Sequence, residues 1–167
     1  LHYVHEELRH QIDHVRTLQV RHPEGFLALD ESTCLNLDLL PRRGQDRSST
    51  LLGVLDNTRT PMGARMLRAW IARPLRQAAA IRSRLDAVER LTQQRLTLQD
   101  LRERLGSVRD IERLIARIGS GRGNARDVKA LSDSLLPVPD LRARLEREEA
   151  GLLRETAANM HPLPDLT

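Results

Sequence analysis

Two histidines and a glutamate near the start of the chain form a pattern that could bind a metal. The run HEELRH at 5–10 has the residue types of the helical zinc-protease motif. That motif needs histidines four residues apart, so that both rings lie one helical turn from each other and reach one zinc ion. His5 and His10 are five apart, while His10 and His14 have the right spacing but no evident third ligand or general base. We interpret these histidines as exposed polar side chains.

A glycine-rich run, GSGRGN at 119–124, has a composition typical of loops that cradle phosphate groups. It reads G-x-G-x-G rather than the dinucleotide pattern G-x-G-x-x-G, it follows no predicted strand, and it lacks the Lys-Ser/Thr ending of a Walker loop. We therefore predict a connection between two helices. Arg122 and Arg126 lie beside the start of the second helix, where they could contact a phosphate or another domain.

The remaining reactive residue types do not combine into a catalytic set. Cys34 is the one cysteine, so neither a disulfide within the chain nor a cysteine metal cluster can form. It has no evident histidine partner for nucleophilic catalysis, and no pair of carboxylates stands out. No apolar run approaches the roughly 20 residues that cross a membrane. We predict that this chain is not an enzyme by itself, holds no cofactor or metal, and does not enter a membrane.

Positive charge is concentrated in one segment. The chain has a net charge of +4, but residues 42–84 alone carry ten arginines against two aspartates. Such a patch could meet phosphate or an acidic partner. The alternative is a set of solvated helix faces, in a chain whose single lysine is Lys129 and which therefore prefers arginine throughout.

The elements that must position these residues are mostly helical. A chain of 167 residues suggests one domain, and its apolar residues recur at steps of three and four. These steps predict helices over about 1–18, 51–56, 61–73, 78–94, 98–106, 111–118, 125–135, 140–148 and 152–160. FLAL at 26–29 predicts a strand, and CLNLDL at 34–39 predicts a second strand or part of a short helix. The predicted fold class is all-α: an irregular helical bundle with one small extended or hairpin element near the N-terminus.

The stretch from Thr60 to Leu75 has helix signals at both ends. Thr60 is a capping hydroxyl and Pro61 fits the first helical position, while Pro74 stops the helix. The other predicted helix caps are Ser49 or Thr50, Ser107 and Asn124.

The apolar face of the helix after Thr60 indicates packing against other elements. Its members lie within one arc: Met62, Gly63, Met66, Leu67, Trp70 and Ile71. Glycine in a helix interior costs about 0.5–1 kcal/mol relative to alanine, so Gly63 suggests that another backbone approaches closely there. We predict that this face belongs to the core. Arg65 and Arg68 lie away from it, where they suit a phosphate contact or a salt bridge better than the reading of bases.

Several blocks of the sequence, in order, resemble one known family. LDESTCLNLDL at 29–39 resembles its pattern L-D-x-x-T-x-x-N-L-E-L, with Asp38 where Glu is usual. LLGVLDNTRTPMGARMLRAWIARPL at 51–75 resembles its most recognisable core-domain stretch, and the blocks at 81–91 and 108–131 resemble the helices that follow. On these motifs, which cover about residues 26–145, the chain resembles the MutS family of DNA mismatch-repair proteins.

The resemblance implies a place in a longer protein. Residues 1–167 would be the N-terminal half of the core, or lever, domain, between the connector and clamp domains, with no mismatch-reading, clamp or ATPase domain present. The lever would transmit the DNA-bound state to the nucleotide site. The parent protein would be a homodimer in the bacterial cytosol, associated with the nucleoid. It would bind mismatched double-stranded DNA, ATP with magnesium, and a MutL-like protein.

The same resemblance implies structural rather than catalytic roles for individual residues. Asp30, Thr33 and Asn36 would fix a turn at the junction with the preceding domain. The residues that would set where the central helix starts, packs and ends are Thr60, Pro61, Gly63, Met66, Leu67, Trp70 and Pro74. The alternative hypothesis is an autonomous helical module that binds nucleic acid through the arginines of 42–84.

Overall fold

The computed structural model describes residues 25–163 and the single residue Glu7. The helix predicted over 1–18 therefore lies outside the described residues, apart from Glu7. The elements in the described part are α2 (Glu31–Asn36), the short 3₁₀ helix η2 (Arg47–Ser49), α3 (Leu51–Leu55), α4 (Pro61–Ala72), α5 (Ala78–Gln93), α6 (Arg95–Ser107), α7 (Ile111–Gly119), α8 (Ala125–Leu135), α9 (Val138–Glu146) and α10 (Gly151–Ala158). The predicted all-α class is confirmed for these residues.

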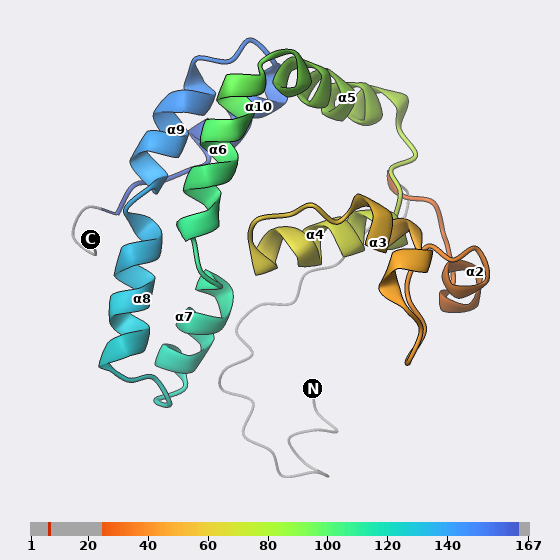
Figure 1. Cartoon of the computed structure of the whole chain (residues 1–167), viewed down its shortest axis with the longest axis horizontal. Helices are drawn as coiled ribbons and strands as arrows, with labels where there is room; N and C mark the ends of the chain where they lie inside the picture. Colours follow the sequence, from red (N-terminus) through yellow and green to blue (C-terminus); the bar gives the residue numbers. More distant parts are fainter. Residues whose placement is uncertain (1–6, 8–24, 164–167) are drawn as a thin grey trace.

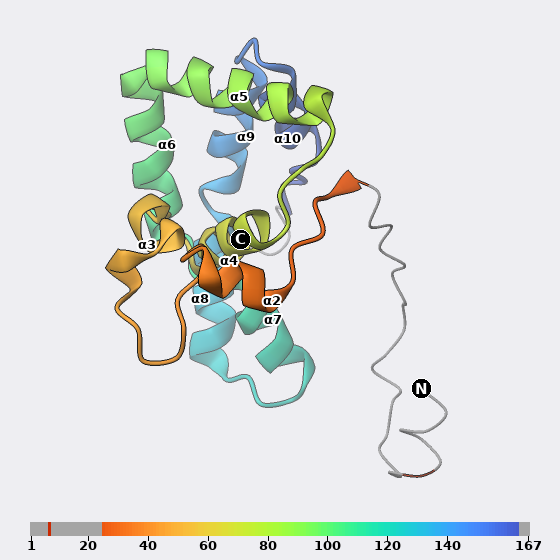
Figure 2. The same ribbon diagram turned by 90° about the vertical axis from the view of Figure 1, so that its right-hand side faces the viewer.

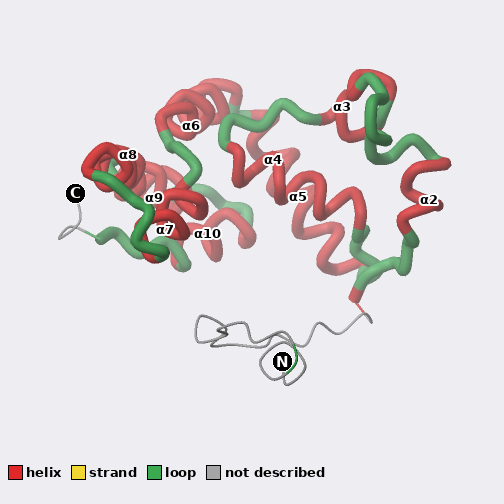
Figure 3. Tube along the Cα trace, turned by 90° about the horizontal axis from the view of Figure 1, so that it is seen from below, coloured by secondary structure: helices red, strands yellow, loops and turns green. Residues whose placement is uncertain are grey.

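The helices form two groups joined by α4 and α5. Figure 3 shows α2 and α3 on one side, α7 to α10 on the other, and α4 and α5 between them. In Figure 1, α5 runs across one end of the molecule, α6 leads away from it, and α7 and α8 form the opposite end. The chain returns through α9 and α10, and α10 packs against both α9 and α5 (Figure 2). No helix among the described residues is long and apolar enough to cross a bilayer.

The extended element near the N-terminus is smaller than predicted. No strand forms over 26–29; Phe26 makes a single antiparallel bridge to Leu75, and the Leu27 N–H donates to the Pro74 carbonyl at 2.9 Å. The segment 34–39 follows its helical alternative, since α2 occupies Glu31–Asn36. The Asp30 carboxylate accepts from the Thr33 N–H at 2.6 Å and starts that helix. Because 34–39 is then not a strand, the segment 26–29 has no second strand with which to form a hairpin.

Most helix ends lie where local signals predict them. Thr50 caps α3, Thr60 caps α4 with Pro61 in its first turn, and Asn124 caps α8 in a reciprocal capping box with Asp127. Ser107 is the exception. It is the last residue of α6, where its hydroxyl donates back to the Arg104 carbonyl, and Asp110 caps α7 instead.

Two separate sets of apolar residues form the interior. Around α2 and α3, Cys34, Leu40 and Leu52 are buried, and Leu29, Leu39, Leu67, Ile71 and Ala72 pack against them. In the other group of helices the buried apolar residues are Ala87, Leu101, Val108, Leu141, Leu153 and Ala157. The interior therefore contains a small core under α4 and further buried apolar residues on or next to α5, α6, α9 and α10.

The predicted apolar stripe of α5 is Ile81, Leu85, Val88 and Leu91, and all of it except the partly buried Leu91 lies on the outside. Ile81, Leu85 and Val88 have the spacing of one helical face, yet their exposed fractions are 38%, 59% and 58%. The helix packs inward through other positions, among them Ala87, which is buried. Exposed apolar residues at the spacing of one helical face are a feature of surfaces that contact other protein.

Candidate functional site

The start of α4 is built from side chains of its own N-terminal loop. The Thr60 hydroxyl accepts from the Gly63 N–H at 3.0 Å. A Cβ on Gly63 would lie 3.0 Å from that same hydroxyl oxygen and 3.5 Å from the Cβ of Thr58. The prediction that another backbone approaches Gly63 is wrong, because the three nearest atoms belong to the side chains of Thr58 and of the capping residue Thr60.

The packed face of α4 is rotated from the predicted one. Leu67 and Ile71, four residues apart, pack with Ala72 against the core around Leu52. Met66 and Trp70 were placed in the core by the sequence pattern, but their exposed fractions are 56% and 43%. That prediction is wrong, since the arc of apolar residues is wider than the surface that the neighbouring helices cover.

Trp70 contacts α5 through a cation rather than through the core. The guanidinium carbon of Arg84 lies 3.7 Å from the centroid of the indole ring, a favourable cation–π geometry. Partial burial at this contact lowers the pKa of Arg84. Arg84 was not predicted as a functional residue, and no local pattern links it to a tryptophan in the preceding helix.

Arg65 joins the central helix to the start of α7. Its guanidinium donates to both oxygens of Asp110, at 2.8 Å and 2.7 Å, and its Nε donates to Glu112 at 3.1 Å. The two partners lie 45 and 47 residues further along the chain. This fork is a bidentate charge-assisted contact, the geometry in which arginine holds a carboxylate most specifically. The predicted salt-bridge role of Arg65 is therefore present within the chain itself.

The electrostatics of this contact follow from its geometry. The hydrogen bonds from Arg65 lower the pKa of Asp110 to about 2, assisted by the Arg113 N–H and opposed by partial desolvation. The Asp110 and Glu112 hydrogen bonds in turn raise the pKa of Arg65. Side-chain exposure is 39% for Arg65 but 16% for Asp110, so water screens the arginine more than the aspartate. Asp110 also caps α7, which ties the ion pair to the helix start.

This geometry predicts a pH-dependent contribution to stability. A carboxyl whose pKa is lowered on folding stabilises the fold above its unfolded pKa, near 3.8, and the stabilisation disappears as pH falls through about 2. We expect Asp110→Asn, which keeps a good capping side chain, to lower the thermal unfolding midpoint between pH 5 and 7. The difference from the unmodified chain should shrink as pH falls toward 2 and vanish below it.

Circular dichroism melts at several pH values test this prediction. Asp133→Asn is the matched control, because Asp133 pairs with Lys129 in an exposed i,i+4 contact on one helix. A difference between Asp110→Asn and the unmodified chain that persisted unchanged at pH 2 would contradict the ionic role of Asp110.

The three residues predicted to fix a turn lie together at α2. Asp30 caps the helix by accepting from the Thr33 N–H, and the Asn36 side chain accepts from Arg42 at 2.9 Å. The Thr33 carbonyl accepts from the Leu37 N–H as the helix ends. Their role at a junction with a preceding domain stays a prediction. Pro74 follows the last turn of α4, and its carbonyl holds the extended segment at Leu27.

The other three arginines that were predicted to make phosphate or interdomain contacts do not take part in the ion pair at Arg65. Arg68 lies on an exposed part of α4, and no described residue forms an ion pair with it. Arg122 and Arg126 are exposed near the α7–α8 loop, where Arg117 and not either of them pairs with Asp127. Their contacts with phosphate or another domain stay predictions.

The glycine-rich loop 119–124 connects α7 to α8, as predicted. The Asn124 side chain already accepts the N–H groups at the start of α8, which a phosphate would otherwise use. A Cβ on Gly123 would lie 2.8 Å from the Ile118 Cα, so this glycine serves close packing onto α7. Within 25–163 no group of His, Cys, Asp and Glu is arranged to hold a metal ion.

Comparisons with known proteins place this helical arrangement in a family. The family model of MutS domain III matches residues 32–166. The chain is 34% identical to the DNA mismatch repair protein MutS of Halothermothrix orenii and 38% identical to that of Methanosarcina barkeri. It is 40% identical to the MutS of Myxococcus xanthus. Each of these matches covers 99% of this chain and 19% of the relative, so the chain spans about one fifth of the length of these relatives.

The sequence blocks, the helical fold and these matches agree. The match to the family model begins within α2 and ends after α10, so it covers nearly all the described helices. This chain belongs to the MutS domain III family.

Proposed function

We propose that this chain is the lever segment of a MutS-type mismatch-repair protein and links the DNA-bound state to the nucleotide site. The observation that carries the proposal is the Arg65 fork, which connects α4 to α7 through Asp110 and Glu112. Because α4 also packs on the small core around Leu52, one helix contacts both groups of helices. A displacement of either group of helices would therefore change the distance between Arg65 and its partners Asp110 and Glu112.

The exposed apolar side chains support a place inside a larger protein. Ile81, Leu85 and Val88 form a stripe on α5, and Met66 and Trp70 are exposed on α4. Single exposed apolar residues are ordinary, but a stripe at helical spacing matches a surface that other protein covers. We propose that the connector, clamp and ATPase domains of the parent chain lie against this domain.

The chemistry of the parent protein lies elsewhere in this proposal. Mismatch selection in double-stranded DNA, and the binding of ATP with magnesium, a second copy of the chain and a MutL-like protein, would belong to other domains, in the bacterial cytosol and near the nucleoid. This segment would do no catalysis and would change only the relative stability of domain arrangements, a coupling that is reciprocal between the two sites. Family membership does not favour the alternative of an autonomous nucleic-acid-binding module built on 42–84.

The test uses the full-length protein that contains this chain. We expect Arg65→Glu to reduce the stimulation of ATP turnover by mismatched DNA by about fivefold or more, with DNA-free turnover close to normal, because coupling energies of this kind are about 1–3 kcal/mol. Adding Asp110→Arg, which reverses the pair, should restore part of the stimulation.

Arg68→Glu is the matched control, since it reverses the same charge on the same exposed helix without a described ion-pair partner. Equal stimulation in the Arg65 and Arg68 variants would show that the fork does not transmit the DNA-bound state. Mismatch-selective binding or ATP hydrolysis by the 167-residue chain alone would refute the lever proposal as a whole.

A further inference from the structure

A cleft between the loop before α4 and the side of α6 collects positive charge. Its volume is about 480 Å³. The residues that line it include Arg59, Arg95, Leu98, Gln99, Arg102 and Glu103. Three arginines against one glutamate leave an excess of two positive charges on its wall. Two of these arginines, Arg95 and Arg102, lie outside the arginine-rich segment 42–84.

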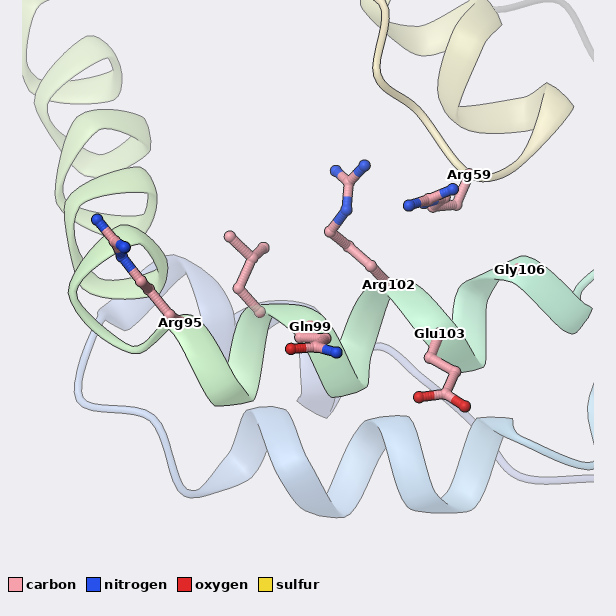
Figure 4. Close-up of a pocket in the computed structure, with 7 residues that line it drawn as sticks. Arg59, Arg95, Gln99, Arg102, Glu103 and Gly106 are labelled. Carbon is pink, nitrogen blue, oxygen red and sulfur yellow. The ribbon is translucent and has the colours of Figure 1, made fainter.

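Two of the guanidinium groups face each other across this cleft. Figure 4 shows Arg102 extending from α6 and Arg59 extending from the loop toward it, while Glu103, which also lines the cleft, points in a different direction from Arg102. Arg95 is the first residue of α6 and precedes Arg102 on the same helix. The cleft wall therefore keeps one carboxylate, Glu103, beside its three arginines.

Arginines elsewhere on this surface behave differently. Arg104, on the same helix, pairs with Asp100 and Asp140, and Arg90 pairs with Glu148. No described residue forms an ion pair with Arg59, Arg95 or Arg102. Like charges that face each other across a concave surface attract an anion, and the attraction is strongest for a ligand with more than one negative charge.

Both walls of the cleft are held in place. The loop that carries Arg59 is fixed by the Thr58 hydroxyl, which donates to Asp56 at 2.7 Å, and by the Arg47–Asp56 ion pair at 3.0 Å. On the other wall, α6 is anchored by Leu101, which is 5% exposed. A site whose donors are positioned before binding loses less entropy when the ligand arrives.

We propose that this cleft binds phosphate groups, with Arg59 and Arg102 as the two sides of the contact. A phosphate presents several oxygens in different directions and can accept from two guanidinium groups that come from opposite walls. A single carboxylate carries one charge and would leave the lining positive. Contacts of this kind hold a phosphate backbone without reading bases, so the cleft would position nucleic acid and not select a mismatch.

The test measures binding of a short, labelled, fully paired DNA duplex to the 167-residue chain by fluorescence anisotropy across a salt series. We expect the double variant Arg59→Gln, Arg102→Gln to bind about tenfold more weakly, and its salt slope to fall by about 2, because each lost phosphate contact removes about one released counterion. The control, Arg43→Gln with Arg154→Gln, removes two exposed arginines outside the cleft and should change both quantities far less.

Two further ligands, inorganic pyrophosphate and a polyglutamate peptide, complete the experiment. Inorganic pyrophosphate, followed by calorimetry, separates a free phosphate ligand from a nucleic-acid backbone; either one, if bound through Arg59 and Arg102, supports the phosphate site. Equal losses in the cleft and control variants, or no binding of either ligand, would overturn it. So would cleft-dependent binding of a polyglutamate peptide without binding of duplex or pyrophosphate. None of these readouts uses ATP turnover, so a failure of the phosphate site can be distinguished from a failure of the lever proposal.

Discussion

Replacing Gly53 by alanine is expected to disrupt the group of helices around α3. A Cβ at this position would lie 1.7 Å from the Arg47 carbonyl oxygen and 2.4 Å from its carbon. That carbonyl cannot move aside easily, because it accepts from the Thr50 N–H at 3.1 Å and from the Thr50 hydroxyl at 2.8 Å. Overpacking against fixed backbone costs more than crowding a side chain, so we expect a loss of about 3 kcal/mol or more in unfolding free energy.

The measurement is urea unfolding followed by the fluorescence of Trp70. This is the single tryptophan of the chain and lies on α4, beside the affected core, so its signal reports on this part of the fold. Gly106→Ala is the matched control, because a Cβ there meets nothing within 4 Å and the residue lies inside α6. We expect the control to be unchanged or more stable by up to about 1 kcal/mol, from helix propensity. Equal unfolding midpoints for the two variants would contradict the close approach at Gly53.

Removing the Glu148 side chain is the second change with a large expected effect. Glu148 is 5% exposed and accepts from the Arg90 Nε at 2.9 Å, so it ties α5 to the turn between α9 and α10. Its loss would leave Arg90, whose side chain is 27% exposed, without its buried partner. Breaking one side of a buried ion pair is strongly destabilising, and the partial exposure of Arg90 reduces the effect, so we expect Glu148→Ala to cost about 2–3 kcal/mol.

The neighbouring residue supplies the control for this variant. Glu149 approaches the same arginine at 3.6 Å, but its side chain is 84% exposed. We expect Glu149→Ala to change the unfolding free energy by less than about 0.5 kcal/mol, as is usual for surface ion pairs. Urea unfolding measures both variants. A lower urea midpoint with an unchanged dependence of the unfolding free energy on urea concentration reports a loss of stability. Similar losses in the two variants would show that burial does not distinguish the two glutamates.

Local features of the sequence predict the helices well. Thr60 with Pro61, Thr50 and Asn124 mark helix starts that the structure confirms, because a cap or a proline acts through hydrogen bonds and sterics within one turn. Ser107 is a counterexample, although it too is a local signal. Asp110, three residues further on, caps α7 instead. The ordered motif blocks also indicate the family, because a run of matching residues can be recognised without knowing how the helices pack.

The partners of individual side chains could not be predicted in this way. Arg65 meets Asp110 and Glu112 only because the chain folds back over more than forty residues, and no periodicity encodes that return. The cleft arginines illustrate the same limit, since Arg59 lies in the loop before α4 and Arg102 lies on α6, the third helix after that loop. Their proximity exists only after α6 is placed beside the start of α4.

The sequence by itself determined which residues form helices, where those helices begin, and to which family they belong. It also determined which residues share a face, as at Met66 and Trp70 or at Ile81, Leu85 and Val88. Only the tertiary structure decided which of these faces is covered: Leu67 and Ile71 pack inward, while Trp70 and the α5 stripe remain exposed. The physical reason is that helical periodicity depends on backbone geometry within one segment, whereas burial depends on the surfaces that other segments bring to it.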